Sequence, residues 1–172
     1  DPVEGRRQFE AAAQAGHPVA AIVATNLLAS GIAGPRDWPR ALARMAGEAR
    51  TDPRRTVQAD LLARMALGDG GSPASLPSSE RLSDAPDVQL FPRLVSAAEC
   101  AYLVELASRA FQPAQVRNPA GGMMRDPIRA SDESTLHWMI EDPVVHAINR
   151  RLAAICGTDA AQGEAMQILR YR

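Results

Sequence analysis

Three histidines and the carboxylates near them are the residues of this chain that could bind a metal ion. His146 follows Asp142 by one turn of an expected helix, and Glu133 and His137 have the same spacing. Side chains four residues apart lie on the same face of a helix, so either pair could supply two ligands. Solvated positions on a helix face or in a loop are the alternative interpretation of both pairs. His17 stands directly before a proline, which is typical of a capping or surface position at a helix start.

The elements that would position these residues begin with an all-helical region over residues 1–68. This region is rich in alanine and leucine, and proline recurs where helices are expected to start. Pro18 and Pro53 are 35 residues apart, which is the period of a repeated helical hairpin. We expect helices at Pro18–Ser30, from about Asp37 to Ala49, and from Pro53 to near Gly68.

Residues 69–86 interrupt the helical pattern. Glycine, serine, proline and aspartate dominate this segment and no periodicity continues through it, which predicts a linker or a long loop. The chain is therefore expected to divide near residue 80.

Residues 87–172 alternate between strand and helix patterns, which predicts an α+β domain. The expected order is a strand at Val88–Phe91, a helix after a capping box at Ser96, extended segments at 113–116 and 127–130, a helix from Asp142 to Gly157, and a last strand. We expect two helix faces in the core, one formed by Cys100, Leu103, Val104 and Ala107 and the other by Val145, Ile148, Leu152 and Ile155.

Composition excludes some classes of partner. The formal net charge is −1, with 19 basic residues that are all arginine, so there is no electrostatic case for binding nucleic acid or an anionic membrane. No apolar run approaches the roughly 20 residues needed to cross a bilayer. The arginine, alanine and proline content suggests a GC-rich, bacterial genome rather than any function. We expect a cytoplasmic protein. Cys100 and Cys156 fit no metal-binding or redox spacing, and we expect two buried free thiols.

Four short segments, taken in order, carry a family resemblance. They are Leu94–Cys100 (LVSAAEC), Arg129–Ser131 (RAS), Ile148–Leu152 (INRRL) and Gly163–Tyr171 (GEAMQILRY). Together they resemble the N-terminal part of a prolyl 4-hydroxylase-like Fe(II)/2-oxoglutarate-dependent dioxygenase. The resemblance implies the opening helices and strands of a double-stranded β-helix (jelly roll), truncated before its metal-binding strands.

The same resemblance implies roles for four residues. Tyr171 matches a tyrosine that reaches the 2-oxoglutarate pocket, and the alternative is a tyrosine at a barrel edge. Arg129, Ser131 and Glu164 match residues along the substrate groove, where an arginine and a carboxylate could bind an extended peptide. Alternatively, Arg129 and Glu164 pair with each other across strands. Ala130 replaces the usual threonine, which weakens the case for collagen-like substrates.

The segment Asn118–Asp126 matches a mobile family loop that closes over the substrate, and a disordered surface loop is the alternative. In the family, an H-x-D pair follows soon after the tyrosine and supplies two of the three iron ligands, whereas none of the histidines here begins such a pair. The parent protein would use Fe(II), 2-oxoglutarate and ascorbate as reductant. This chain alone is expected to hold no metal triad and to bind neither iron nor 2-oxoglutarate tightly. It is also expected to expose unpaired strand edges, through which it could self-associate.

The helical region resembles Sel1-like and other TPR-like repeats over about residues 8–66, through His17-Pro18 and the later Trp38 segment. Such repeats present a concave surface to protein partners. The chain is thus expected to be part of a hydroxylase that acts on a peptidyl substrate, such as a prolyl residue, or on a small molecule. The alternative is a non-catalytic helical-repeat scaffold for protein–protein interaction, or a helical extension that only packs on the next domain.

Overall fold

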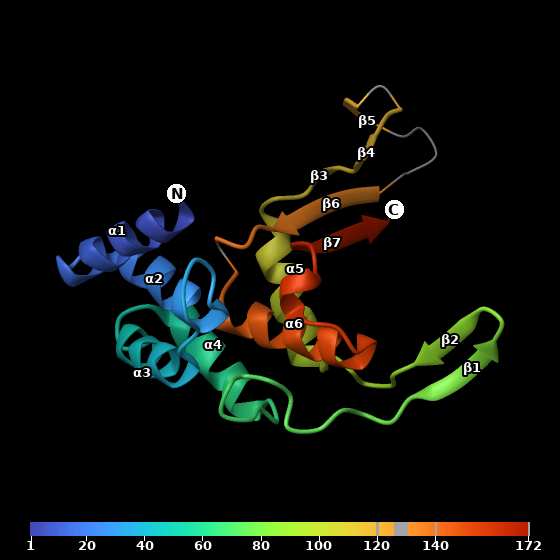
Figure 1. The fold of residues 1–172 in the computed structure, drawn as a ribbon, viewed down its shortest axis with the longest axis horizontal. Helices are drawn as coiled ribbons and strands as arrows, with labels where there is room; N and C mark the ends of the chain where they lie inside the picture. The colour runs from blue at the N-terminus through green and yellow to red at the C-terminus, as the bar shows by residue number, and fades with distance from the viewer. Residues whose placement is uncertain (120, 126–130, 140, 172) are drawn as a thin grey trace. The chain divides into compact units, whose positions relative to one another are not determined.

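The computed structural model describes residues 1–119, 121–125, 131–139 and 141–171 (Figure 1). Helices and small antiparallel sheets alternate along these residues, so the α+β class is confirmed. The chain groups into two compact units. The first comprises residues 1–96 and 139–163, and the second comprises residues 97–138 and 164–171 of the described chain. In this grouping the helix that follows Asp142 belongs to the unit with the N-terminal helices.

Four consecutive helices open the first unit, and each packs against the next. They are α1 (Pro2–Gln14), α2 (Pro18–Ser30), α3 (Trp38–Glu48) and α4 (Pro53–Arg64). Every one has a proline in its first two positions, where the missing N–H leaves no helical hydrogen bond unmade. Asp1, His17, Asp37 and Asp52 cap them by accepting backbone N–H groups. The expected helix starts are therefore confirmed, and the capping interpretation of His17 is confirmed with them.

The end of α4 differs from the expectation. The helix ends at Arg64, before Gly68, and the chain then folds into a tight loop in which Leu67 bridges to Pro73. Gly71 has a positive φ of 73°, and a Cβ there would lie 2.6 Å from the nearest ring carbon of Trp38. The loop can approach the Trp38 ring only because residue 71 has no side chain.

A buried charged network joins three of these helices. The Arg55 side chain is 2% exposed, and its Nε lies 2.7 Å from Glu48 Oε2. Its two other nitrogens donate to Gln58 Oε1, Asn26 Oδ1 and the Ile22 carbonyl, at 2.7 to 3.0 Å. The second Glu48 oxygen accepts a hydrogen bond from the Thr25 hydroxyl at 2.5 Å. The charge of Arg55 is thereby paired by Glu48 on α3, and its other N–H groups donate to acceptors on α2 and α4.

Helix α6 (Pro143–Cys156) completes the core of the first unit by packing against α2 and α4. Asp142 caps it and Gly157 ends it in the left-handed conformation, as expected. Val145 and Ile148 are buried, which confirms half of the predicted core face. Leu152 is 37% exposed, so its placement in the core was wrong. The short 3-10 helix η1 (Ala160–Gln162) follows.

The segment expected to be a linker contains a strand. β1 (Glu80–Asp84) pairs antiparallel with β2 (Asp87–Leu90), which confirms the second strand and corrects the prediction of a structureless segment for the first. Arg81 pairs with Asp84 on its own strand and with Asp87 on the facing strand. β1 has no apolar alternation of its own, because the whole hairpin is exposed or nearly so.

The second unit consists of one helix and two small sheets. α5 (Ala97–Ser108) packs against β6 (Ser131–Leu136) and β7 (Met166–Tyr171). β6 lies between β7 and the short β3 (Gln112–Pro113), with both neighbours antiparallel. β4 (Gln115–Arg117) and β5 (Met123–Arg125) form a separate hairpin. The strands that the structure describes do not close into a barrel, and the expected extended segment at 127–130 lies outside them.

The buried face of α5 is offset from the predicted one. Glu99, Tyr102 and Ala107 are buried, whereas Val104 is 58% exposed. Cys100 and Cys156 are both exposed free thiols, so the prediction of two buried cysteines was wrong. Cys100 lies four residues before the exposed Val104, on the same side of α5.

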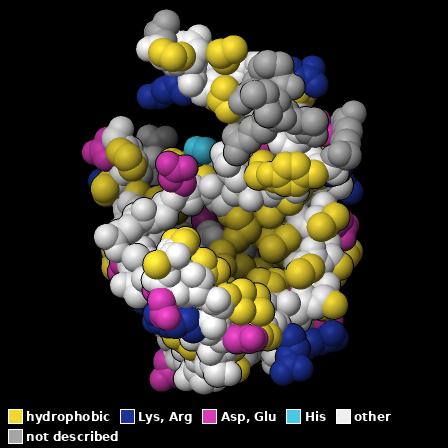
Figure 2. Space-filling view, turned by 90° about the vertical axis from the view of Figure 1, so that its right-hand side faces the viewer, with side chains coloured by type: hydrophobic (Ala, Val, Ile, Leu, Met, Phe, Trp, Pro, Cys, Tyr) yellow, Lys and Arg dark blue, Asp and Glu magenta, His cyan; other side chains and the backbone are white. Residues whose placement is uncertain are grey.

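Hydrophobic side chains also reach the surface elsewhere, as Figure 2 shows in yellow for one face. Among the helices in the described parts of the chain, none is long and apolar enough to span a bilayer.

Candidate functional site

The pairing of β6 with β7 brings two of the predicted site residues together. Ser131 lies directly opposite Tyr171 in the antiparallel register. Directly opposed side chains point to the same face of a sheet, with Cβ atoms about 5 Å apart. The Tyr171 side chain is 71% exposed, while Ser131 is 4% exposed and its hydroxyl makes no hydrogen bond within the part of the chain that the structure describes. This end of the sheet therefore presents a solvent-facing phenol beside an unsatisfied serine hydroxyl.

The two other predicted residues do not join this pair. Glu164 is exposed and precedes the start of β7 at Met166, which lies opposite Leu136 at the other end of the sheet. Seven residues of extended chain span roughly 23 Å, so Glu164 and Tyr171 lie at opposite ends of the strand. Arg129 lies outside the described residues.

Asp132 and Arg170 form a site feature that was not predicted. Asp132 lies opposite Arg170 in the register, and Arg170 Nη2 donates to Asp132 Oδ2 at 2.7 Å. The Asp132 side chain is 9% exposed and that of Arg170 is 52% exposed. The Arg170 guanidinium also lies over the Phe111 ring, 4.4 Å from its centroid. The alternation of β6 and β7 could have suggested this pair only if the register between the strands had been known.

The predicted metal-binding pair of Asp142 and His146 is not formed as expected. One carboxylate oxygen of Asp142 accepts the Val144 and Val145 N–H groups, so it caps the start of α6. His146 is buried, and its Nδ1 lies 2.7 Å from Glu141 Oε1. The solvated-surface interpretation of His146 was therefore wrong, and its partner is a different carboxylate. The Nε2 atom of His146 is buried and makes no hydrogen bond to any described residue, and the Trp38 ring lies 6.4 Å away between centroids.

Glu133 and His137 are not brought together as a metal pair. Glu133 lies on β6, a strand, where residues four apart are separated by roughly 13 Å. His137 is exposed and lies beside Trp138, with 5.0 Å between ring centroids. Among the described residues, no three histidine, cysteine, aspartate or glutamate side chains are grouped so that they could hold a metal ion. The described residues thus do not form a group that fits an iron site.

The predicted mobile loop is a short hairpin over most of its length. Asn118 accepts the Gly121 N–H through its carbonyl and the Gly122 N–H through its side chain, which closes the turn between β4 and β5. Gly121 has a φ of 90°, a conformation that glycine adopts readily. Met123 and Met124 lie on β5 and are both exposed. Residues 120 and 126 of this segment lie outside the described part.

The first unit contains a second feature, an apolar hollow of about 690 Å³ between α3, α4 and the loop that follows them. Its walls are mostly hydrophobic and small side chains, including Trp38, Leu42, Ala46, Leu62 and Met65.

Comparisons with known protein families, with characterised proteins and with solved structures found no match to this chain.

Proposed function

We propose that this chain is the N-terminal part of a prolyl 4-hydroxylase-like Fe(II)/2-oxoglutarate-dependent dioxygenase that hydroxylates a peptidyl or small-molecule substrate. The observation that carries the proposal is the register of β6 with β7, which places Ser131 opposite Tyr171. The family resemblance assigns these two residues to the substrate groove and to the 2-oxoglutarate pocket, so it requires them to share one sheet face. They lie on one face of one sheet.

The exposure of the Tyr171 side chain supports its proposed role in binding 2-oxoglutarate. A tyrosine that only fills a core would be buried, whereas the Tyr171 side chain is 71% exposed. Its hydroxyl can donate a hydrogen bond to a carboxylate such as those of 2-oxoglutarate. On the same strand, Arg170 is turned to the opposite face and is held there by Asp132 and Phe111. That arrangement leaves the Tyr171 face free of a competing charge from β7.

The edge of β7 supports a larger sheet. β7 pairs with β6 along one edge, and no described strand pairs with its other edge. A six-residue strand with one free edge offers its unpaired backbone groups to a further strand. In the proposed enzyme, that further strand belongs to the rest of the jelly roll.

The iron ligands are not part of the proposal for this chain, because the described residues do not fit a metal site. In the family, bound iron and 2-oxoglutarate together activate O2, and the products are succinate, CO2 and a hydroxylated substrate. The residues of this chain would orient the co-substrate through Tyr171 and line the substrate groove through Ser131.

The test uses the complete protein encoded by the gene that contains this chain. Succinate formation from 2-oxoglutarate with Fe(II) and ascorbate is expected, and a chelator should abolish it. Tyr171→Phe should raise the KM for 2-oxoglutarate by about three- to tenfold, since one hydrogen bond contributes on the order of 1 kcal/mol. Leu169→Ile, on the same face of β7, is the matched control and should leave that KM unchanged. Absence of succinate formation with any Fe(II) concentration would refute the proposal.

A second candidate function is favoured by the apolar hollow of the first unit. A helical-repeat scaffold needs an open hydrophobic surface to hold a protein partner, and the hollow between α3 and α4 is such a surface. The scaffold predicts partner binding that Leu42→Asp abolishes, together with no succinate formation by the complete protein. Succinate formation would decide for the enzyme.

A further inference from the structure

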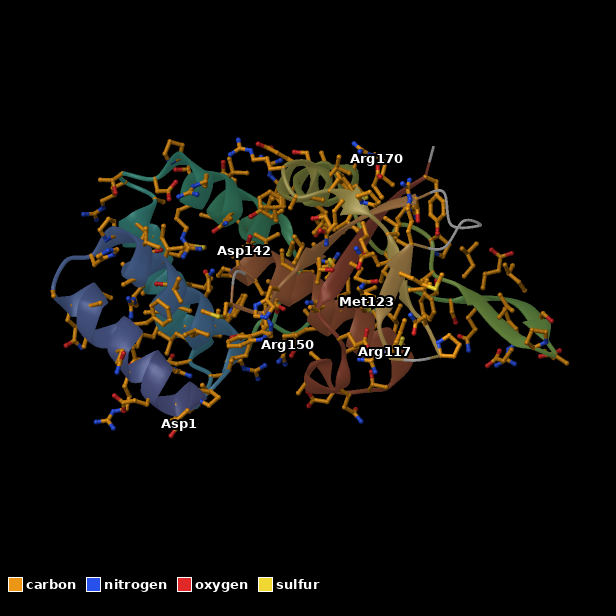
Figure 3. The ribbon with its side chains drawn as sticks, turned by 90° about the horizontal axis from the view of Figure 1, so that it is seen from above. Asp1, Arg117, Met123, Asp142, Arg150 and Arg170 are labelled. Atoms are coloured by element: carbon orange, nitrogen blue, oxygen red, sulfur yellow. The ribbon has the colours of Figure 1, made fainter. Side chains whose placement is uncertain are left out.

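The hairpin of β4 and β5 carries two arginines on one face. Arg117 lies opposite Met123 in the register, and Arg125 lies opposite Gln115. Opposed residues share a face, and so do residues two apart on a strand. Arg117, Met123 and Arg125 therefore point to the same side of the hairpin, and Figure 3 labels Arg117 and Met123 on neighbouring strands.

Both guanidinium groups are exposed, and neither forms an ion pair with any residue that the structure describes. No aspartate or glutamate occurs in the sequence between Glu105 and Asp126. The arginines of the other hairpin and of β7 differ, since Arg81 and Arg170 are paired with carboxylates of their own sheets. The β4–β5 hairpin thus carries two positive charges that no described carboxylate pairs with.

The spacing of the two arginines matches one kind of anion. Arg117 and Arg125 are diagonal neighbours across the strands, so their Cβ atoms lie roughly 7 Å apart. In an extended peptide, side chains two residues apart repeat every 7 Å or so and project to one side. Met123, 61% exposed, lies beside both arginines and can contact the methylene groups of the two acidic side chains.

We propose that this face of the hairpin binds an extended peptide segment with two acidic side chains separated by one residue. Each carboxylate pairs with one guanidinium, and the peptide lies across β4 and β5. Calling that peptide the substrate rests on the proposed dioxygenase function, whereas the binding itself does not require iron or turnover. The substrate class would then be acidic peptide segments and not collagen-like sequences.

The probe is a fluorescein-labelled peptide, Gly-Ser-Glu-Val-Glu-Ser-Gly, titrated with the 172-residue chain and followed by fluorescence anisotropy. Saturable binding is expected at low salt and should weaken as the salt concentration rises from about 50 to 500 mM, because the contacts are exposed ion pairs. A peptide with glutamine at both acidic positions should bind about tenfold more weakly, since each exposed pair contributes on the order of threefold.

Matched variants locate the surface. The double variant Arg117→Gln/Arg125→Gln should lose about tenfold in affinity, whereas Arg117→Lys/Arg125→Lys, which keeps the charge, should stay within about threefold. Arg40→Gln/Arg50→Gln removes two exposed charges from the first unit and should bind as the unaltered chain does. The proposal would be overturned if the glutamate and glutamine peptides bound with equal affinity. It would also be overturned if Arg117→Gln/Arg125→Gln bound the glutamate peptide as tightly as Arg40→Gln/Arg50→Gln does, or if no saturable binding occurred up to millimolar protein. Peptide binding without succinate formation would reject the dioxygenase and keep the binding surface.

Discussion

Asp132 and Arg170 face each other across β6 and β7, with 2.7 Å between Asp132 Oδ2 and Arg170 Nη2, and the aspartate is the more buried partner. In the register of these strands, the pair of Asp132 and Arg170 is directly next to the pair of Ser131 and Tyr171. Because neighbouring residues on a strand point to opposite faces, the ion pair fixes the face on which Tyr171 lies. The stability of this pairing therefore bears on the candidate site.

Replacing Asp132 by asparagine should lower the free energy of unfolding of the sheet by about 1–2 kcal/mol. The ion pair is lost, but Arg170 is half exposed and water can solvate its guanidinium. Urea unfolding followed by far-UV circular dichroism measures the change. Glu133→Gln, on the next residue of β6, is the control, and an equal loss in both variants would show that the pair contributes nothing specific.

Replacing Arg55 by glutamine should destabilise the helical unit by about 3–5 kcal/mol. The shorter side chain cannot reach all its present acceptors, and Glu48 loses its buried counter-charge. Arg50→Gln, at an exposed position after α3, should change stability by no more than about 0.5 kcal/mol. Thermal unfolding of the three proteins compares them, and an unchanged Tm for Arg55→Gln would contradict the network's role.

Replacing Gly71 by alanine should destabilise the loop over Trp38 by about 2–4 kcal/mol. Alanine is strained at a φ of 73°, and its Cβ would lie 2.6 Å from the Trp38 ring. Gly70→Ala is the matched control, because the nearest atom to a Cβ there is an Arg36 side-chain nitrogen at 3.5 Å. Chemical unfolding followed by tryptophan fluorescence reports the difference, and equal stability of both variants would exclude the close contact.

The cap of α4 should make stability depend on pH in the acid range. A hydrogen bond from the Arg54 side chain, together with one from the Arg54 backbone N–H, holds the pKa of Asp52 below its ordinary value of 3.8. A carboxyl whose pKa is lower in the folded state contributes stability above its unfolded pKa, and this contribution is lost as the pH falls through the folded pKa.

Arg54→Gln should raise the pKa of Asp52 towards its ordinary value and reduce the loss of stability between about pH 5 and pH 2. An NMR titration of the Asp52 carboxyl carbon gives the pKa directly. The same titration in Arg7→Gln, which removes an exposed arginine of α1, should leave Asp52 unchanged. A pKa of Asp52 that does not respond to Arg54→Gln would refute the assigned cause.

Calorimetric titration of the 172-residue chain with Mn(II) and 2-oxoglutarate should give no micromolar binding. Tyr171 alone contributes one hydrogen bond, about 1 kcal/mol, against the roughly 8 kcal/mol that micromolar affinity requires. Stoichiometric binding would show that His146 and Glu141, the buried pair with an unsatisfied ring nitrogen, belong to a site. His146→Gln would then abolish it.

Helix starts were predictable because their signals are local. A capping residue and a proline stand side by side at Pro18, Pro53 and Pro143, and each helix begins there. The partners of β1 and the pair of Asp132 with Arg170 were not predictable, since both depend on a strand register that only the folded chain defines. The burial of His146 was missed for a related reason. Its helix contacts α2 and α4, which end at Ser30 and Arg64, far earlier in the chain, and the spacing of residues within α6 does not indicate that contact.

The route of the chain between the two units has a consequence for how this protein is made. The strands β6 and β7 are neighbours in one sheet. In the sequence, however, they are separated by residues 139–163, which include α6 and belong to the other unit. During synthesis, β6 leaves the ribosome well before its partner and must wait with one edge uncovered until α6 and β7 have both emerged. A polypeptide that stops at residue 138 would release the first unit without α6 and the sheet without β7, so premature termination there would damage both units at once.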